Sequence, residues 1–242
     1  MTEEISLAQS VDGLYDTDLG PKEFVFIYAG YASILLRTKT AVVVLDPADL
    51  FSKVKKHIKS LDLITYSHSH YDHYNLSNAV ALYKKTEATI ISEYSMVDDL
   101  RKKIPSEKVL SGPEVFQGLR DGPKFKLDGI KVELHRGVHP RQITQCRVTI
   151  GRLKIFHAAD SGYWPVGKGE VDVAFLPTGW PSPTCAPGVA LAMAMDMRPT
   201  FAVAVHGEDE QSQTFKHFVE HELPDTTVVI PQVNELVILS KP

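Results

Sequence analysis

Short apolar runs separated by turn residues fill the first half of the chain. Runs of about four to eight residues, bounded by Gly, Pro or charged side chains, are typical of β-strands. Such runs predict strands over residues 24–29, 33–38, 41–45, 61–66 and 88–92. A helical spacing of apolar positions predicts helices over 50–60, 75–85 and 96–104.

The second half of the chain repeats this rhythm. Its apolar runs predict strands over 130–135, 147–150, 153–158, 171–177, 201–205, 227–230 and 236–239, and helices over 187–195 and 211–221. Strands outnumber helices, so the pattern favours two sheets with helices outside over a doubly wound parallel sheet. No linker rich in Pro, Gly or Ser divides the halves, which predicts one domain over 1–242 that begins with a polar lead-in over 1–20.

Composition and charge narrow the class of protein. The 242 residues include 26 Lys and Arg and 30 Asp and Glu, a formal net charge of −4, and this balance predicts no nucleic-acid partner. The two cysteines, Cys146 and Cys185, exclude a disulfide scaffold and indicate a reducing compartment. We expect neither a signal peptide nor a membrane-spanning helix, since no apolar run reaches about 18 residues. The expected protein is therefore cytoplasmic and acts on a small molecule, and the sequence leaves a homo-oligomer open.

The sharpest chemical signal is the segment His-Ser-His-Tyr-Asp-His over residues 68–73. Positions two apart in an extended segment point the same way, so His68 and His70 can present two imidazoles to one ion. The chain then turns, and Asp72 and His73 can face a second ion. Imidazole nitrogens and carboxylate oxygens are ligands of zinc, and also of manganese or iron. A solvated polar loop is the plain alternative, but so dense a pattern seldom arises by chance.

Four residues cannot complete two metal sites, so further ligands are expected at later strand ends. His139, Asp160 and His206 each follow an apolar run, where a strand delivers a side chain to the edge of a sheet. His135 lies close to His139 and is the alternative third histidine. A lone histidine beyond a strand is more often a surface residue, but the order of these residues after the first motif is much more specific.

Together these residues resemble the metallo-β-lactamase superfamily. The likeness runs from about residue 24 to residue 239 and includes the opening meander, the His-rich loop and the later ligands in order. The segments FVFIYAGYASILL, FHAADSGYWP and VAVHGE look most like the compact branch that includes ascorbate-6-phosphate lactonase and many metal-dependent hydrolases. The resemblance implies an α+β fold, a four-layer αββα sandwich of two mixed β-sheets. The implied ligands are His68, His70 and His139 for one metal, Asp72, His73 and His206 for the other, and Asp160 as the bridge.

Other positions refine what the resemblance implies. Asp46 is expected to fix the orientation of the His loop from behind the ligands. The branch commonly has His where this chain has Tyr31, and Gly where it has Ala159, so this second position is expected to avoid positive φ. Redox diiron members typically carry Glu where this chain has His70, which favours hydrolysis over an iron-dependent oxidoreductase.

The implied reaction is hydrolysis by a hydroxide that bridges two divalent metals, zinc above all, with Asp72 orienting it as well as binding metal. Two cations, two carboxylates and a hydroxide leave about one positive charge, which favours an anionic substrate. Small esters, lactones, amides and phosphodiesters fit this chemistry. A non-hydrolytic metal-binding or sensing protein is the alternative on the same fold. The candidate substrate contacts are Tyr71, Tyr74, Arg141, Tyr163 and Trp180.

Overall fold

A computed structural model describes residues 6–116, 122–166 and 169–242 of the protein. Its contacts divide the chain into two compact units, and each contains one mixed seven-stranded sheet with helices beside it. Unit 1 comprises residues 1–92, 96–111 and 232–242, and unit 2 comprises residues 93–95 and 112–231. The expected pair of mixed sheets is confirmed, whereas the single domain over 1–242 stays a prediction.

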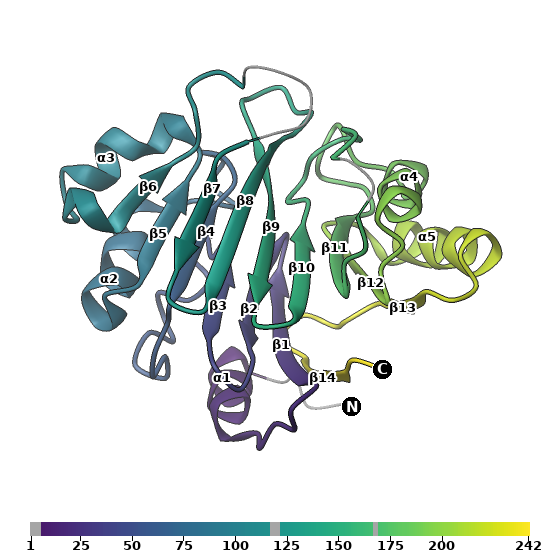
Figure 1. Cartoon of the computed structure of the whole chain (residues 1–242), viewed down its shortest axis with the longest axis horizontal. Coiled ribbons are helices and arrows are strands. Elements are labelled where there is room, and N and C mark those ends of the chain that lie inside the picture. Colours follow the sequence, from purple (N-terminus) through teal and green to yellow (C-terminus); the bar gives the residue numbers. More distant parts are fainter. Residues whose placement is uncertain (1–5, 117–121, 167–168) are drawn as a thin grey trace. The chain divides into compact units, whose positions relative to one another are not determined.

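The sheet of unit 1 is antiparallel at one side and parallel at the other (Figure 1). Its strands are, in spatial order, β14 (Leu236–Ser240), β1 (Glu23–Gly30), β2 (Ser33–Arg37), β3 (Val42–Leu45), β4 (Leu63–Tyr66), β5 (Thr89–Ser92) and β6 (Val109–Ser111). Pairing is antiparallel from β14 to β3 and parallel from β3 to β6. The helices are α1 (Leu7–Asp16), α2 (Leu76–Thr86) and α3 (Val97–Arg101), with a short 3₁₀ turn at Ser106–Lys108. A second 3₁₀ turn, Tyr94–Met96, begins in unit 2 and ends in unit 1. Both faces of β3 and β4 are buried, which explains their continuous apolar sequence.

Helix α1 stands where the sequence predicts a polar lead-in. Ser6 caps the helix and forms a capping box with Gln9, while Val11 and Leu14 are buried in the core of unit 1. The pattern Ser-x-x-Gln followed by spaced apolar residues is the local signal for such a helix. The lead-in is therefore corrected to a helix that packs against β1 and β14.

The helix predicted over 50–60 is also absent, because this segment forms successive turns. Four backbone N–H groups between residues 50 and 57 each donate to the carbonyl of the residue three positions earlier. In an α-helix each N–H donates to the carbonyl four positions earlier. The predicted apolar face is nevertheless correct, since Phe51, Val54 and Ile58 are buried in the core of unit 1.

The sheet of unit 2 has the same mixed character. Its strands are, in spatial order, β13 (Thr227–Val229), β12 (Phe201–Val205), β11 (Val173–Pro177), β10 (Leu153–His157), β9 (Thr144–Ile150), β8 (Ile130–Arg136) and β7 (Lys124–Leu127). Pairing is parallel from β13 to β10 and antiparallel from β10 to β7. Helices α4 (Pro187–Met197) and α5 (Asp209–Glu222) lie side by side next to β11, β12 and β13 (Figure 1).

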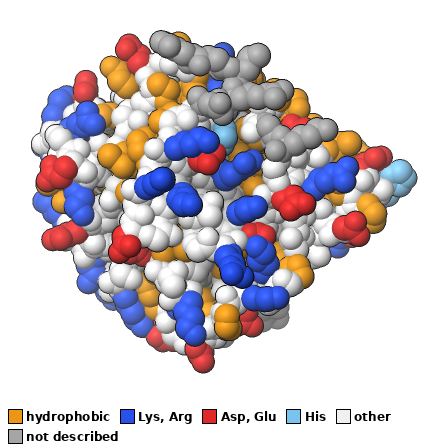
Figure 2. Space-filling view, in the orientation of Figure 1, with side chains coloured by type: hydrophobic (Ala, Val, Ile, Leu, Met, Phe, Trp, Pro, Cys, Tyr) orange, Lys and Arg blue, Asp and Glu red, His pale blue; other side chains and the backbone are white. Residues whose placement is uncertain are grey.

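In strands β7, β8 and β10, exposed positions are interspersed with buried or partly buried ones. The exposed positions carry Lys124, Lys126, Lys131 and Lys154, and Figure 2 shows Lys and Arg side chains spread over these strands. One face of this half of the sheet therefore meets solvent, whereas the wholly buried β11 carries apolar residues throughout. Among the described residues, no helix combines the length and the apolar character needed to cross a bilayer.

Candidate metal centre

Parallel strands deliver the ligand candidates of unit 1 to one edge of its sheet. β3 and β4 are parallel neighbours, so their carboxyl ends lie at the same edge. Asp46 follows β3, Ser67 and His68 follow β4, and the Asp46 N–H donates to the Thr65 carbonyl over 3.0 Å. The buried carboxylate and the first histidine thus begin at adjacent strand ends.

Asp46 is fully buried and accepts three hydrogen bonds from the His loop. Its Oδ1 accepts from the Ser67 N–H at 2.7 Å, and its Oδ2 accepts from Ser67 Oγ at 2.5 Å and from His73 Nδ1 at 2.8 Å. These donors stabilise a charge that would otherwise be costly to bury. Because Nδ1 of His73 is bonded to the carboxylate, Nε2 is the nitrogen that this ring presents to a metal.

Ser67 extends the same network to His68. Its Oγ lies 3.0 Å from His68 Nδ1, and its single hydrogen is directed at Asp46. His68 Nδ1 therefore acts as the donor to Ser67, and His68 also presents Nε2. The sequence analysis did not single out Ser67, although its place directly before the first histidine is a usable signal.

Unit 1 brings the donors of residues 68–73 together in two pairs. The ligand atoms of His68 and His70 lie within 4.8 Å of each other. In the second pair, Asp72 Oδ2 lies 3.6 Å from His73 Nε2. His68, Asp72 and His73 are buried and His70 is partly exposed.

Unit 2 gathers the later candidates at the carboxyl ends of its strands. Asp160 follows β10 and His206 follows β12, and both strands run parallel to β11 between them. Asp160 Oδ2 lies 3.5 Å from His139 Nε2 and 3.9 Å from His206 Nε2, with all three side chains buried. His135, the alternative to His139, is a strand residue opposite Gln145.

The separations within each unit fit metal ligands better than hydrogen bonds. An N–H···O hydrogen bond usually spans about 2.7–3.2 Å. Two ligand atoms that each lie about 2.1 Å from one tetrahedral ion are about 3.4 Å apart. The 3.6 Å pair of Asp72 with His73 and the 3.5 Å pair of His139 with Asp160 are close to this second value. Neutral imidazoles combined with carboxylates suit a divalent transition metal.

Three side chains from one loop hold the backbone of Asp160. Its carbonyl oxygen accepts from Ser182 Oγ at 2.9 Å, from Thr184 Oγ1 at 2.9 Å and from Cys185 Sγ at 3.1 Å. Burial raises the pKa of the Cys185 thiol to about 12, so the sulfur keeps its hydrogen at neutral pH. Cys185 is thus a hydrogen-bond donor to Asp160 and not a nucleophile.

The backbone before Asp160 differs from the expectation. Ala159 has a φ of 54°, although the absence of Gly there predicts that positive φ is avoided. The left-handed conformation costs a residue with a Cβ roughly 1–2 kcal/mol. A tight turn holds it in place, since the Ser161 N–H donates to the Ala158 carbonyl over 3.1 Å. The expectation about Ala159 is therefore wrong, because the turn after β10 overrides the local preference.

The candidate substrate contacts have different surroundings. Tyr74 packs edge-on against Tyr66 with the ring centroids 5.0 Å apart, and burial raises the pKa of Tyr74 to about 12. The Tyr74 ring therefore packs against the core of unit 1. Tyr71 and Trp180 are 78% and 64% exposed. Tyr163 donates to Asp196 Oδ2 at 2.9 Å.

The family of the chain follows from comparison with known proteins. A family model described as the beta-lactamase superfamily domain matches residues 42–207. This stretch includes Asp46, the His loop and every later ligand candidate up to His206. The chain belongs to the β-lactamase superfamily.

Relatives of this β-lactamase-superfamily chain carry a common name. A protein of Aeropyrum pernix named "UPF0173 metal-dependent hydrolase" is 28% identical over 233 residues, which cover 86% of this chain and 94% of that protein. A protein of the same name from Saccharolobus solfataricus is 30% identical over 168 residues, which cover 63% of this chain and 70% of that protein. The narrower resemblance to the lactonase branch stays a prediction.

A solved structure supports the fold. A metallo hydrolase from the archaeon Ignicoccus hospitalis matches with a TM-score of 0.70 and 21% identity, over 91% of this chain and 100% of that one. This likeness confirms the fold class expected from the sequence, that of the metallo-β-lactamases.

Proposed function

We propose that this protein is a dinuclear metal hydrolase whose two units supply ligands to one pair of cations. Metal-dependent hydrolysis follows from the superfamily and from the names of its relatives. The number of metals, the ligand assignment and the substrate are our proposal. Zinc is the metal that this donor set favours, with manganese or iron as other occupants.

The observation that carries the proposal is the presence of an incomplete set of donors in each unit. Unit 1 offers the pairs His68 with His70 and Asp72 with His73, whereas unit 2 offers Asp160 flanked by His139 and His206. Each of two tetrahedral or five-coordinate sites needs at least three protein ligands, and even with one shared ligand a pair needs more than the four donors of unit 1 or the three of unit 2. We therefore assign His139 to the first pair, His206 to the second, and Asp160 to both metals.

The contact of His139 with Asp160 supports its choice over His135. His139 Nε2 lies 3.5 Å from the carboxylate oxygen assigned as the bridge. The Nδ1 of the same ring lies 3.2 Å from the Arg141 backbone nitrogen, so Nε2 is the ring nitrogen that faces the Asp160 carboxylate.

The chain's own residues would prepare the site for hydrolysis. When bound, a pair of divalent cations supplies a hydroxide nucleophile near neutral pH and stabilises negative charge on the attacked group. Asp72 would orient the nucleophile with the carboxylate oxygen that does not bind metal. Asp46 would keep His73, and through Ser67 also His68, in the tautomer that offers Nε2.

About one net positive charge would remain at the site, which favours a small anionic ester, lactone, amide or phosphodiester as substrate. Cys146 and Cys185 form no disulfide, which fits the reducing cytoplasm as the place of this reaction.

Metal content and turnover test this function together. We expect the purified protein to hold about two transition-metal ions, measured by inductively coupled plasma mass spectrometry. We also expect a chelator to abolish hydrolysis of a panel of chromogenic esters and phosphodiesters. The variants His70→Ala and His206→Ala should each lose about one ion, whereas His221→Ala, at an exposed position of α5, should keep both.

Full activity of the metal-free protein would contradict the proposal. Two bound ions without turnover on the panel would favour a metal-binding or sensing function instead. A coloured, iron-containing protein would favour an oxidoreductase.

A further inference from the structure

A hollow beside His139 lies wholly within the described part of unit 2. It measures about 280 Å³ and is lined by residues 114–116 and by residues of the segment 136–143. Its charged side chains are Arg136, Arg141 and Glu114, so one positive charge is in excess. His139, a proposed metal ligand, forms part of the same wall.

The backbones of both arginines are held next to the hollow, and the Arg136 side chain is stacked as well. The guanidinium carbon of Arg136 lies 4.6 Å from the centre of the Trp164 ring, and the Arg136 carbonyl accepts from Gln145 Nε2 at 3.3 Å. The Arg141 N–H donates to His139 Nδ1. Stacking occupies the flat face of a guanidinium and leaves its edge of N–H groups to bind oxygen atoms.

We propose that Arg136 and Arg141 bind a phosphate or carboxylate group of the substrate that does not itself react. This inference rests on the proposed hydrolase function and names the substrate class more narrowly, as a molecule that carries such a group in addition to the bond that is cleaved. The planar fork of arginine matches two oxygens of either group. An anion held here would lie beside His139, and therefore close to the proposed metals.

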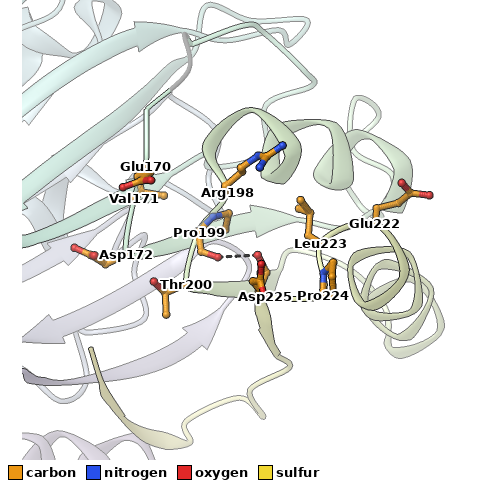
Figure 3. A pocket seen from close by; sticks show the side chains of 11 residues that line it. Glu170, Val171, Asp172, Arg198, Pro199, Thr200, Glu222, Leu223, Pro224 and Asp225 are labelled. Carbon is orange, nitrogen blue, oxygen red and sulfur yellow. Dashed lines mark hydrogen bonds between the residues drawn. The ribbon is translucent and has the colours of Figure 1, made fainter. Parts of the chain in front are cut away.

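A second hollow of unit 2 has the opposite character. It measures about 390 Å³ and lies at the amino ends of β11, β12 and β13, whereas Asp160 and His206 follow carboxyl ends (Figure 3). Four carboxylate side chains line it against the single arginine Arg198, as the sticks in Figure 3 show. Its charge disfavours an anion, in contrast to that of the hollow beside His139.

Anion binding by the chelator-treated, metal-free protein tests the proposal. The probes are inorganic phosphate and succinate, titrated in separate isothermal calorimetry experiments at low ionic strength. We expect both Arg141→Ala and the double variant Arg136→Ala with Arg141→Ala to bind at least about tenfold more weakly than the unaltered protein. Arg141→Lys keeps the charge but loses the planar fork, so its affinity should lie between those of the unaltered protein and Arg141→Ala.

Arg152→Ala is the matched control. Arg152 lies in the turn between β9 and β10, beyond the opposite end of these strands from Arg136, and its loss removes the same charge. It should leave binding unchanged. If Arg136→Ala prevents folding because of the Trp164 contact, the exposed Arg141 alone carries the test.

Two results would overturn the proposal. The first is that the unaltered metal-free protein binds neither probe. The second is that Arg152→Ala weakens binding as much as Arg141→Ala, which would indicate general charge attraction. Because no metal is present in this experiment, its failure leaves the metal count and the turnover of the loaded protein untouched.

Discussion

At the scale of single residues, one buried carboxylate controls two of the proposed metal ligands. Asp46 is bonded directly to His73 and through Ser67 to His68. We assign these two histidines to different metals, so the network would couple the two sites. Backbone strain accompanies this network at Asp46, which has a positive φ of 45°.

Substitution at this network has a graded expected effect on metal affinity. Asp46→Asn replaces one acceptor oxygen by a donor, which should weaken metal binding about 10–100-fold. Ser67→Ala removes the hydroxyl that links Asp46 to His68 but keeps the backbone bond to Asp46, and it should weaken metal binding about tenfold. Ser67→Thr should retain most of the affinity. The measurement is competition with a chromophoric chelator.

Ser52→Ala is the control for this series. Ser52 also lies in unit 1, and its hydroxyl donates only to the Asp49 carbonyl. Its affinity for metal should match that of the unaltered protein. Equal affinity in Asp46→Asn would show that the network plays no part in holding the ligands.

At the scale of elements, parallel strand ends explain why the candidate ligands could be identified from the sequence. Asp160 and His206 follow apolar runs that form β10 and β12, as predicted. Ser182 and Thr184 could not be identified in this way, because they act through hydroxyl contacts to a backbone carbonyl and follow no pattern. The helix predicted over residues 50–60 was wrong for a related reason. A series of turns can bury apolar side chains that have helical spacing, so the spacing alone does not identify a helix.

Helix α1 yields a stability prediction. Leu14 is fully buried in the core of unit 1, so Leu14→Ala should lower the free energy of unfolding by about 2–5 kcal/mol. Asp16→Ala, at an exposed position of the same helix, should change it by less than about 1 kcal/mol. Urea denaturation monitored by circular dichroism measures both free energies of unfolding. An unchanged free energy in Leu14→Ala would contradict the packed helix and favour a loose lead-in instead.

At the scale of the whole molecule, the two units are built from interleaved parts of the chain. Unit 1 begins near the N-terminus and is completed by β14, which pairs with β1. The sequence predicts the described strands except β6 and β7, which no predicted strand covers. It cannot give the order of the strands, because pairing between strands more than 200 residues apart leaves no local signal. The ligand candidates are likewise shared, with four in unit 1 and three in unit 2.

The most direct test of this account is anomalous diffraction from crystals of the metal-loaded protein. We predict two metal peaks, each ligated by side chains from both units, with Asp160 bound to both ions and His139 bound to one. A single ion ligated only by residues 68–73, or metal peaks without His206 and Asp160 among their ligands, would contradict it.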